Sequence, residues 1–290
     1  MSHVDDAVSR LGAHARSARS TPAQLTSRWL RDRKVWLLPM LLSDYGRQIM
    51  ERKYDAIATD RAYDLRPSGR WGPIGVLVDW VVLHQDIHVG LRQRLALVVD
   101  EVVDAVHDRW TAGIDQVRLA SGPCGLARDL RLAWQRLDSP HGRLKVIGLD
   151  LDPTGEVLPL VAQRAAQANL PLRTARCNLL DDTALATALE HRPVDVFLSI
   201  GLSVWLEPPE LAHLLAGFNR GLLPDGVLVV DNFRAHGASR FARDLELETR
   251  YHEPASFEEA LRTAGFTIER TRETRNHVNV VYRCRKAASL

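Results

Sequence analysis

Two glycines in a strand-to-helix turn are the first residues that could bind a ligand. The stretch QVRLASGPCGLARDL, residues 116–130, changes from an apolar strand pattern to glycine and proline, and then to a helical pattern. Gly122 and Gly125 permit a close backbone approach, and the helix that follows offers unpaired N–H groups at its start. The turn is compatible with a nucleotide-like ligand and with an ordinary connection, since one glycine-rich loop does not separate them.

A carboxylate follows this loop at the spacing that ribose recognition requires. Asp150 ends the apolar run LKVIGLD, about 25 residues beyond Gly125. A carboxylate at the end of the second strand of a nucleotide-binding unit can accept both hydroxyl protons of a ribose. Asp152 and Pro153 fit the cap and the first turn of the next helix. We therefore predict that Asp150 binds the ligand and that Asp152 caps the helix.

The elements that must position these groups alternate regularly after residue 110. Apolar runs are predicted as strands at 117–120, 144–152, 172–177, 194–200 and 226–233. Helical patterns lie between them at 126–137, 155–169, 183–191 and 208–222. Apolar strands separated by helices indicate a parallel sheet covered on both faces, with its ligand at the carboxyl ends of the strands. Two last runs, 266–274 and 278–286, are typical of a terminal hairpin.

Residues 1–110 have a different hydrophobic pattern and are predicted as an all-helical extension. The segment RLALVVDEVVDAVHDRW places its apolar residues at helical spacing. We therefore expect a helical substrate or lid domain over 1–110 and a core domain over 111–290. The densest polar stretch of the extension, DWVVLHQDIHVGLRQR, is the expected place of substrate specificity.

Composition restricts the partners and the compartment. Of 290 residues, 38 are Lys or Arg and 36 are Asp or Glu, so a net charge of +2 predicts no nucleic-acid partner. The 3 cysteines are too few for a disulfide framework, which favours a reducing, cytoplasmic setting. The longest apolar run, GVLVDWVVL, is too short to span a membrane. We expect a small-molecule substrate, no membrane partner and a homodimer as one option.

The order of these motifs over residues 117–286 resembles the class I S-adenosylmethionine-dependent methyltransferases. ASGPCG is similar to their glycine motif, GLDLDP to the acidic second motif, and ARCNLLDD to the adenine-contacting loop. VDVFLSIGLSVWL is similar to the fourth motif and LLPDGVLVVDNF to the turn into the fifth strand. The resemblance implies an α/β, Rossmann-like, seven-stranded, mostly parallel sheet with an antiparallel C-terminal hairpin. Together with PSGRWGPIG, the chain also resembles bacterial methyltransferase-like proteins with a helical N-terminal extension.

The resemblance implies S-adenosylmethionine as the cofactor and a set of residues that bind it. These are Ser121, Gly122, Gly125, Asp150, Leu151, Asn178, Leu179, Ser199 and Gly201. The chain departs from the family at Ala120, which replaces the acid of the first motif. Asn178 stands where an aspartate commonly binds the adenine amino group, and its side-chain carbonyl can accept the same hydrogen bond. Asp181 and Asp182 behind it are expected to cap a helix.

Methyl transfer needs mainly positioning of a nucleophile, with a base where a hydroxyl must lose its proton. The expected catalytic residues are Asp79, Ser203 and Asp231, and the expected substrate-binding residues are Tyr45, His84, Arg92, Trp205 and Asn232. Asp79 lies within an apolar run, so it is predicted to be buried and to need a partner such as Arg92, a backbone donor, or a substrate amine or hydroxyl. An ion pair alone would mean that Asp79 only fastens the extension. His84 and His88 have half of a metal-site spacing, but no metal is predicted.

Three functions fit the sequence. The first is methyl transfer from S-adenosylmethionine to a small molecule. The second uses the same cofactor but transfers or cyclises its aminocarboxypropyl arm, as nicotianamine synthases and azetidine-carboxylate-forming cyclases do, and releases methylthioadenosine. The third is a binding module without catalysis. The unusual SGPCG loop favours the second function, because displacement at another carbon of the sulfonium requires a rearranged pocket around the methionine end, but the sequence does not decide between the three.

Overall fold

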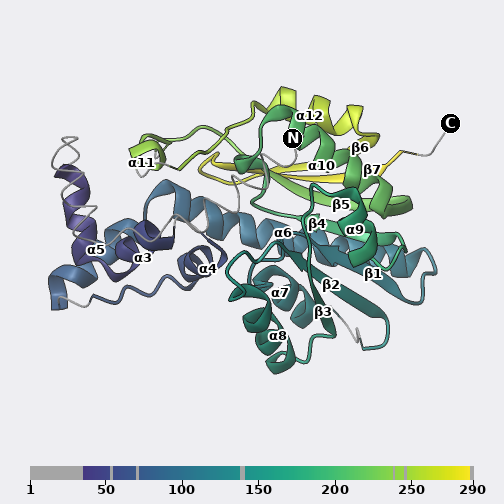
Figure 1. The fold of residues 1–290 in the computed structure, drawn as a ribbon, viewed down its shortest axis with the longest axis horizontal. Helices are drawn as coiled ribbons and strands as arrows, with labels where there is room; N and C mark the ends of the chain where they lie inside the picture. The colour runs from purple at the N-terminus through teal and green to yellow at the C-terminus, as the bar shows by residue number, and fades with distance from the viewer. Residues whose placement is uncertain are drawn as a thin grey trace.

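A seven-stranded sheet forms the centre of the protein (Figure 1). The computed structural model describes residues 35–52, 55–69, 72–137, 141–237, 239–244 and 247–287, so the start of the predicted extension lies outside the described residues. The strands stand in the order β3-β2-β1-β4-β5-β7-β6. Their bounds are β1 Val117–Ser121, β2 Leu144–Asp150, β3 Leu172–Arg176, β4 Val194–Ser199, β5 Leu222–Phe233, β6 Phe266–Glu273 and β7 Asn279–Lys286.

Strands β1 to β5 run parallel, and β7 is antiparallel to both β5 and β6. Strand β1 lies between β2 and β4, so the winding reverses there, with Ala120 paired to Ile147 and to Phe197. This confirms the predicted mostly parallel sheet and its C-terminal hairpin. Strand β5 begins earlier than predicted, because Leu222 already pairs with Val194.

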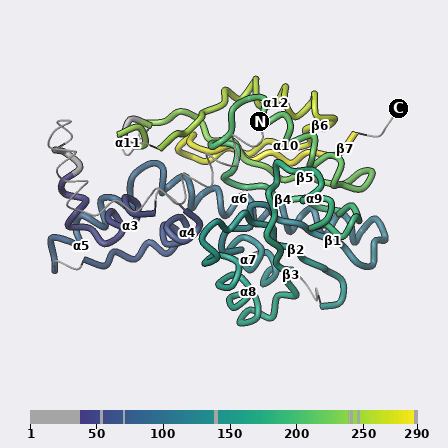
Figure 2. The backbone as a smooth tube through the Cα atoms, in the orientation of Figure 1, coloured from purple at the N-terminus to yellow at the C-terminus, as the bar shows by residue number. Residues whose placement is uncertain are grey.

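Helices cover both faces of the sheet, as the apolar strand pattern predicts. On one face, α9 (Asp182–Ala188), α10 (Pro208–Gly221) and α12 (Pro254–Thr263) bury an apolar cluster against Phe197 and Leu228. On the other face, α6 (Asp86–Thr111), α7 (Arg128–Arg136) and α8 (Val157–Gln167) pack on Leu119 and Val229. Figure 2 shows the same two layers on opposite sides of the strands.

The described part of the N-terminal extension forms a separate lobe at one end of the molecule (Figure 1). It consists of η1 Val35–Leu42, α3 Asp44–Arg52, α4 Ala56–Asp64 and α5 Gly72–Leu83. Helix α6 joins this lobe to the core: Leu91 packs in the lobe, whereas Val98 and Val102 pack on the sheet. The division predicted at residue 110 therefore falls at the end of a helix that contributes to both parts.

Asp181 is the N-cap of α9, as predicted, whereas α8 begins at Val157 with Glu156 as its N-cap, so Pro153 precedes the helix and does not occupy its first turn. Asp152 accepts the N–H groups of Val157 and Leu158 at 3.0 and 3.1 Å, at the start of α8. Asp181 accepts two N–H groups of the first turn of α9, at 2.9 and 3.0 Å. Each side chain satisfies donors that a helix start leaves unpaired.

Over the residues that the structure describes, no helix is by itself both long enough and apolar enough to cross a membrane. Helices α5 and α6 reach that length and composition only as a pair, and this pair is bent by 60°.

Candidate functional site

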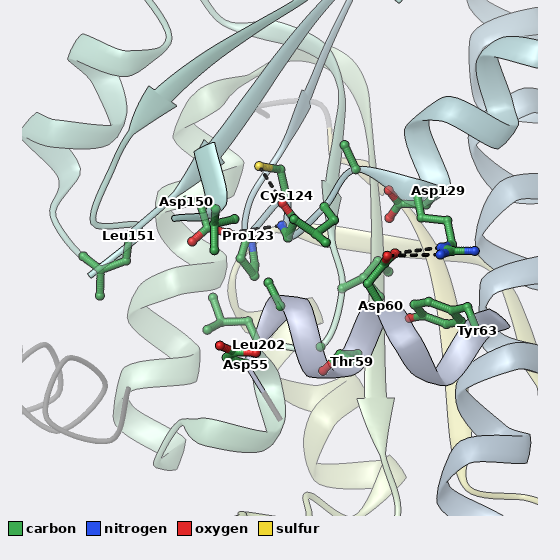
Figure 3. Close-up of a pocket in the computed structure, with 18 of the residues that line it drawn as sticks. Asp55, Thr59, Asp60, Tyr63, Pro123, Cys124, Asp129, Asp150, Leu151 and Leu202 are labelled. Carbon is green, nitrogen blue, oxygen red and sulfur yellow. Dashed lines mark hydrogen bonds and ion pairs between the residues drawn. The ribbon is translucent and has the colours of Figure 1, made fainter. Parts of the chain in front are cut away.

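A cavity of about 300 Å³ opens at the carboxyl ends of β1, β2 and β4 (Figure 3). Three loops line it, at residues 123–129, 150–154 and 200–202. Helix α4 and Arg94 of α6 line the opposite side. The position is the one at which doubly wound sheets bind ligands, outside the strand ends where the winding reverses.

Gly125 is the glycine that faces this cavity. Its φ of +46° lies in the left-handed region, where a side chain is strained. A Cβ atom at Gly125 would meet only the Ala56 side chain within 4 Å, at 3.7 Å, so it would project into space between the loop and α4. The loop thus offers an open backbone cradle at Gly125.

Gly122 has a packing function in this loop. A Cβ atom at Gly122 would lie 2.8 Å from a methyl group of Leu179, and Gly122 does not line the cavity. Its small size allows Leu179 to pack closely on the loop. Gly122 and Leu179 therefore pack on each other, neither lines the cavity, and their predicted contact with a cofactor stays a prediction.

Asp150 lies at the end of β2 and lines the cavity, as predicted. Its carboxylate accepts the Gly125 N–H at 3.1 Å and the Asp152 N–H at 3.0 Å, which fixes its orientation. Burial raises the pKa of Asp150 to about 6, against the opposing effect of these N–H groups. A carboxylate oxygen has two lone pairs, so each oxygen can still accept a ligand hydroxyl proton.

A second carboxylate of the cavity, Asp129, was not predicted from the sequence. It lies in the first turn of α7, directly after the glycine loop, and its Oδ1 accepts the Leu130 N–H at 2.8 Å. Burial raises the pKa of Asp129 to about 6, although the Leu130 N–H and the positive charge of Arg94 oppose the rise. Asp129 is thus ionised at neutral pH and available to a cationic group.

Helix α4 supplies another wall of the cavity, of which Asp55 and Thr59 were not predicted from the sequence. Asp55, Thr59 and Tyr63 all line the cavity. Their spacing of four residues puts them on one helix face, and this periodic polar pattern is a signal that the sequence contained. Figure 3 shows these three side chains on the side of the cavity opposite Asp150.

Ion pairs attach α4 to the core. The Asp60 carboxylate accepts hydrogen bonds from Arg128 Nε at 2.7 Å and from Arg164 at 2.6 Å. Burial acts to raise the pKa of Asp60, but the hydrogen bonds and charges of both arginines outweigh it and lower the pKa. Arg128 also pairs with Asp64 at 2.8 Å. Helix α4 is therefore held over the cavity by side chains of α7 and α8.

A buried ion pair closes the far end of the cavity. Arg94 donates to the Asp231 carboxylate at 2.7 Å and to the Tyr63 hydroxyl at 3.1 Å. The second oxygen of Asp231 accepts the Gly201 N–H at 2.7 Å. Asp231 is fully buried and does not line the cavity. It therefore positions Arg94 and the loop after β4, and its predicted catalytic role has no support in these contacts.

The structure brings only part of the predicted cofactor set to the cavity. Gly125, Asp150, Leu151 and Gly201 line it, and so does Trp205 from the predicted substrate set. Ser121 and Ser199 are buried in the strand ends behind it. The side-chain carbonyl of Asn178 accepts the Leu180 N–H at 3.1 Å, which fixes a local turn, and its second lone pair leaves the predicted contact with adenine as a prediction.

Other predicted residues of the substrate site lie away from the cavity. Tyr45 is buried in the extension, with its ring 5.2 Å from that of His88. His84 is exposed and lies against Trp80, with ring centroids 4.2 Å apart. Arg92 donates to two backbone carbonyl oxygens, at 2.9 and 2.8 Å. These three side chains contribute to the extension itself.

Two further predicted residues support the segment after β5. The Ser203 hydroxyl donates to the Asp231 carbonyl oxygen at 2.9 Å. The Asn232 amide donates to the His252 carbonyl oxygen at 2.9 Å. Neither residue lines the cavity. Both hold backbone in place behind it.

Asp79 fastens the extension. It is fully buried in α5 and accepts the Tyr45 N–H at 3.0 Å, the Ser68 N–H at 2.8 Å and the Ser43 hydroxyl. Of the partners named from the sequence, Asp79 has backbone donors, and its ion-pair partner is Arg61, at 3.7 Å, and not Arg92. The carboxylate joins η1, α3 and the segment before α5 within the lobe, so these contacts support the fastening alternative and not a catalytic role.

Replacing Asp79 with asparagine should therefore affect stability and leave ligand binding intact. The amide would present an NH₂ group to at least one of the buried donors, so we expect a loss of about 1.5 to 3 kcal/mol in the free energy of unfolding. Denaturant unfolding measures this loss. A stable variant with impaired turnover would return Asp79 to the active site.

No protein-family model and no curated protein matches the sequence. Among solved structures, a possible exported protein from Bordetella parapertussis has a TM-score of 0.65 at 20% identity, with 98% of this chain and 96% of that chain covered. Magnesium protoporphyrin IX methyltransferase from Synechocystis PCC 6803 with bound S-adenosylhomocysteine has a TM-score of 0.55 at 14% identity, covering 81% of this chain and 96% of that one.

An O-methyltransferase family protein from Burkholderia thailandensis has a TM-score of 0.50 at 14% identity, over 73% of this chain and 63% of that chain. At such low identities, these structural likenesses establish a shared fold and not a shared reaction. The strand order, the antiparallel β7 and these likenesses agree with one another. The chain has the fold of the class I S-adenosylmethionine-dependent methyltransferases.

Proposed function

We propose that this protein binds S-adenosylmethionine in the cavity and transfers its methyl group to a small molecule. The observation that carries the proposal is the pair formed by Gly125 and Asp150, which face one cavity and are joined by a hydrogen bond of 3.1 Å. An open glycine cradle beside a carboxylate at the end of β2 is the arrangement that recognises a ribose and the chain attached to it.

The residues present fit this cofactor. A Cβ atom at Gly125 would occupy the cradle, so its absence leaves room for a ligand there. The cavity of about 300 Å³ lies at the lower end of the range of small-molecule sites. Its two carboxylates can accept hydrogen bonds, Asp150 from ribose hydroxyls and Asp129 from an ammonium group.

Each side chain has a defined task in this proposal. When bound, the cofactor supplies a methyl group that its sulfonium has already activated. Asp150 accepts the ribose hydroxyls, and Asp129 binds the ammonium of the aminocarboxypropyl arm. Thr59 and Tyr63 of α4 cover the cavity and exclude water, while Gly201 and Trp205 place the acceptor. Catalysis then depends mainly on orientation of the two reactants.

Product analysis separates this reaction from its alternatives. The protein is incubated with S-adenosylmethionine and pools of small hydroxyl compounds, amines and acids, and the nucleoside products are identified by mass spectrometry. Methyl transfer predicts S-adenosylhomocysteine. Methylthioadenosine would instead indicate transfer or cyclisation of the aminocarboxypropyl arm, and neither product, despite cofactor binding, would favour a binding module. The cytoplasmic setting and the homodimer stay predictions.

Cofactor affinity should fall with pH below about 6. Asp129 and Asp150 bind their ligand groups as carboxylates, and burial raises the pKa of each to about 6. At pH 5 about one tenth of each group is ionised, so we expect roughly a tenfold loss of S-adenosylhomocysteine affinity per group between pH 7 and pH 5. Calorimetric titration across this range measures the loss.

The same two groups change folding stability with pH in the direction opposite to their effect on cofactor affinity. A carboxyl group whose pKa is higher in the folded than in the unfolded state binds more protons when folded, so these two groups add stability as the pH falls from 7 to 5. Unfolding caused by these groups therefore cannot explain weaker binding at pH 5. Constant affinity over this range would exclude Asp129 and Asp150 as ionised ligand contacts.

A further inference from the structure

A second, smaller cavity of about 80 Å³ adjoins the main one. The two cavities share Thr59, Arg94, Gly201 and Trp205. We call the smaller one the side lobe, and its own lining is mainly apolar: Ile87, Leu91, Val204, Phe233, Ala242, Leu247, Thr249 and Tyr251. These residues come from α6, η2 (Ser203–Trp205), β5 and the segment after β5, including α11 (Ser239–Asp244).

The volume and lining of the side lobe restrict what it can hold. A volume of about 80 Å³ is roughly half of a cavity that binds benzene, so the lobe has room for about three or four methyl-sized groups. A cavity of this size with apolar walls favours a compact alkyl group over a polar one. A flat ring or a charged group does not match it.

The side chain of Arg94 lies at the junction between the two cavities and is 4% exposed. The charge of Arg94 is already balanced by Asp231 at 2.7 Å, which favours a neutral oxygen over a carboxylate.

We propose that the side lobe binds the alkyl group of the methyl acceptor, and that the acceptor is a small neutral alcohol. Its compact branched alkyl end occupies the lobe between Leu91, Phe233 and Ala242. Its hydroxyl group lies at the junction, beside the Arg94–Asp231 pair, whose balanced charge favours a neutral head group. This inference rests on the proposed methyl transfer, because the main cavity must then hold the cofactor beside it.

Ligand-observed NMR titration of the protein saturated with S-adenosylhomocysteine tests this assignment. The probes are ethanol, 3-methylbutan-1-ol and 3-methylbutanoate. The alkyl end of the longer alcohol has three more carbon atoms than ethanol, so we expect it to bind roughly 50-fold more tightly. Equal affinity of the two alcohols would overturn the apolar subsite, and tighter binding of 3-methylbutanoate would overturn the neutral head group.

Substitutions in the side lobe test whether the alcohol binds there. Ala242→Phe fills the side lobe and should abolish the preference for 3-methylbutan-1-ol, and Thr249→Phe provides a second filling variant at a less buried position. Ala166→Phe, on the exposed surface of α8, should keep the preference. S-adenosylhomocysteine affinity is measured in each sample. If the wild type does not bind S-adenosylhomocysteine, the proposed function is refuted. If both filling variants bind it with intact affinity and keep the preference for 3-methylbutan-1-ol, only the side-lobe assignment is refuted.

Discussion

Replacing Arg94 with methionine is expected to lower the free energy of unfolding by about 3 to 5 kcal/mol, since it leaves the Asp231 carboxylate buried without its partner. Arg94 and Asp231 are 4% and 0% exposed, and 2.7 Å separates their charged atoms. The loss is large because solvent cannot replace the guanidinium. Chemical denaturation monitored by tryptophan fluorescence measures it.

The double replacement of Arg94 with methionine and Asp231 with leucine is the matched control. Removing both charges also removes the desolvation cost, so we expect the double variant to recover at least half of the stability lost by the single one. A loss below 1 kcal/mol in the single variant would contradict the assignment of this ion pair as the fastener between α6, β5 and the loop after β4.

Replacing Gly125 with valine is expected to weaken S-adenosylhomocysteine binding by at least about 100-fold. The new side chain would project into the cradle between the loop and α4, where we place the ligand. A β-branched residue at a φ of +46° is also strained, at a cost on the order of 1 to 2 kcal/mol. Calorimetric titration measures the affinity of the variant.

The variant Gly113→Val separates the effect of backbone strain from the effect of a side chain in the cavity. Gly113 has a φ of +86°, and a Cβ atom there would meet nothing within 4 Å, so this variant carries backbone strain outside the cavity. We expect reduced stability with normal ligand affinity. If Gly125→Val binds S-adenosylhomocysteine as tightly as Gly113→Val does, the cradle does not hold the ligand.

The sheet could be predicted from the sequence because its central strands β1, β2 and β4 are buried on both faces. The run VDVFLS of β4, for example, is buried throughout, and such continuous apolar runs separated by helical patterns identify a parallel sheet. The hairpin followed from two adjacent strand patterns near the C-terminus. Boundaries were less certain, since β5 gains pairing at Leu222 that depends on its neighbour Val194 and not on its own pattern.

The site was predicted only where local sequence determines it. Asp150 and Gly125 belong to one strand-loop-helix-strand unit, so their spacing in the sequence predicted that both lie at one ligand site. Arg94 and Asp231 are separated by 137 positions and meet only through packing of α6 on the sheet. Gly122 looked equivalent to Gly125, but the close approach of Leu179 from another loop gives it a packing function. Asp79 was correctly expected to be buried, while its partners depended on the folded extension.

Titration of S-adenosylhomocysteine into the wild type and into Asp150→Ala tests the central claim most directly, with NAD as the control ligand. We predict saturable binding to the wild type and no binding of NAD. Loss of the ribose acceptor in Asp150→Ala should weaken binding by about 1.5 to 3 kcal/mol, or roughly 10- to 100-fold. Equal affinity of the two proteins, or binding of NAD alone, would contradict the placement of S-adenosylmethionine in this cavity.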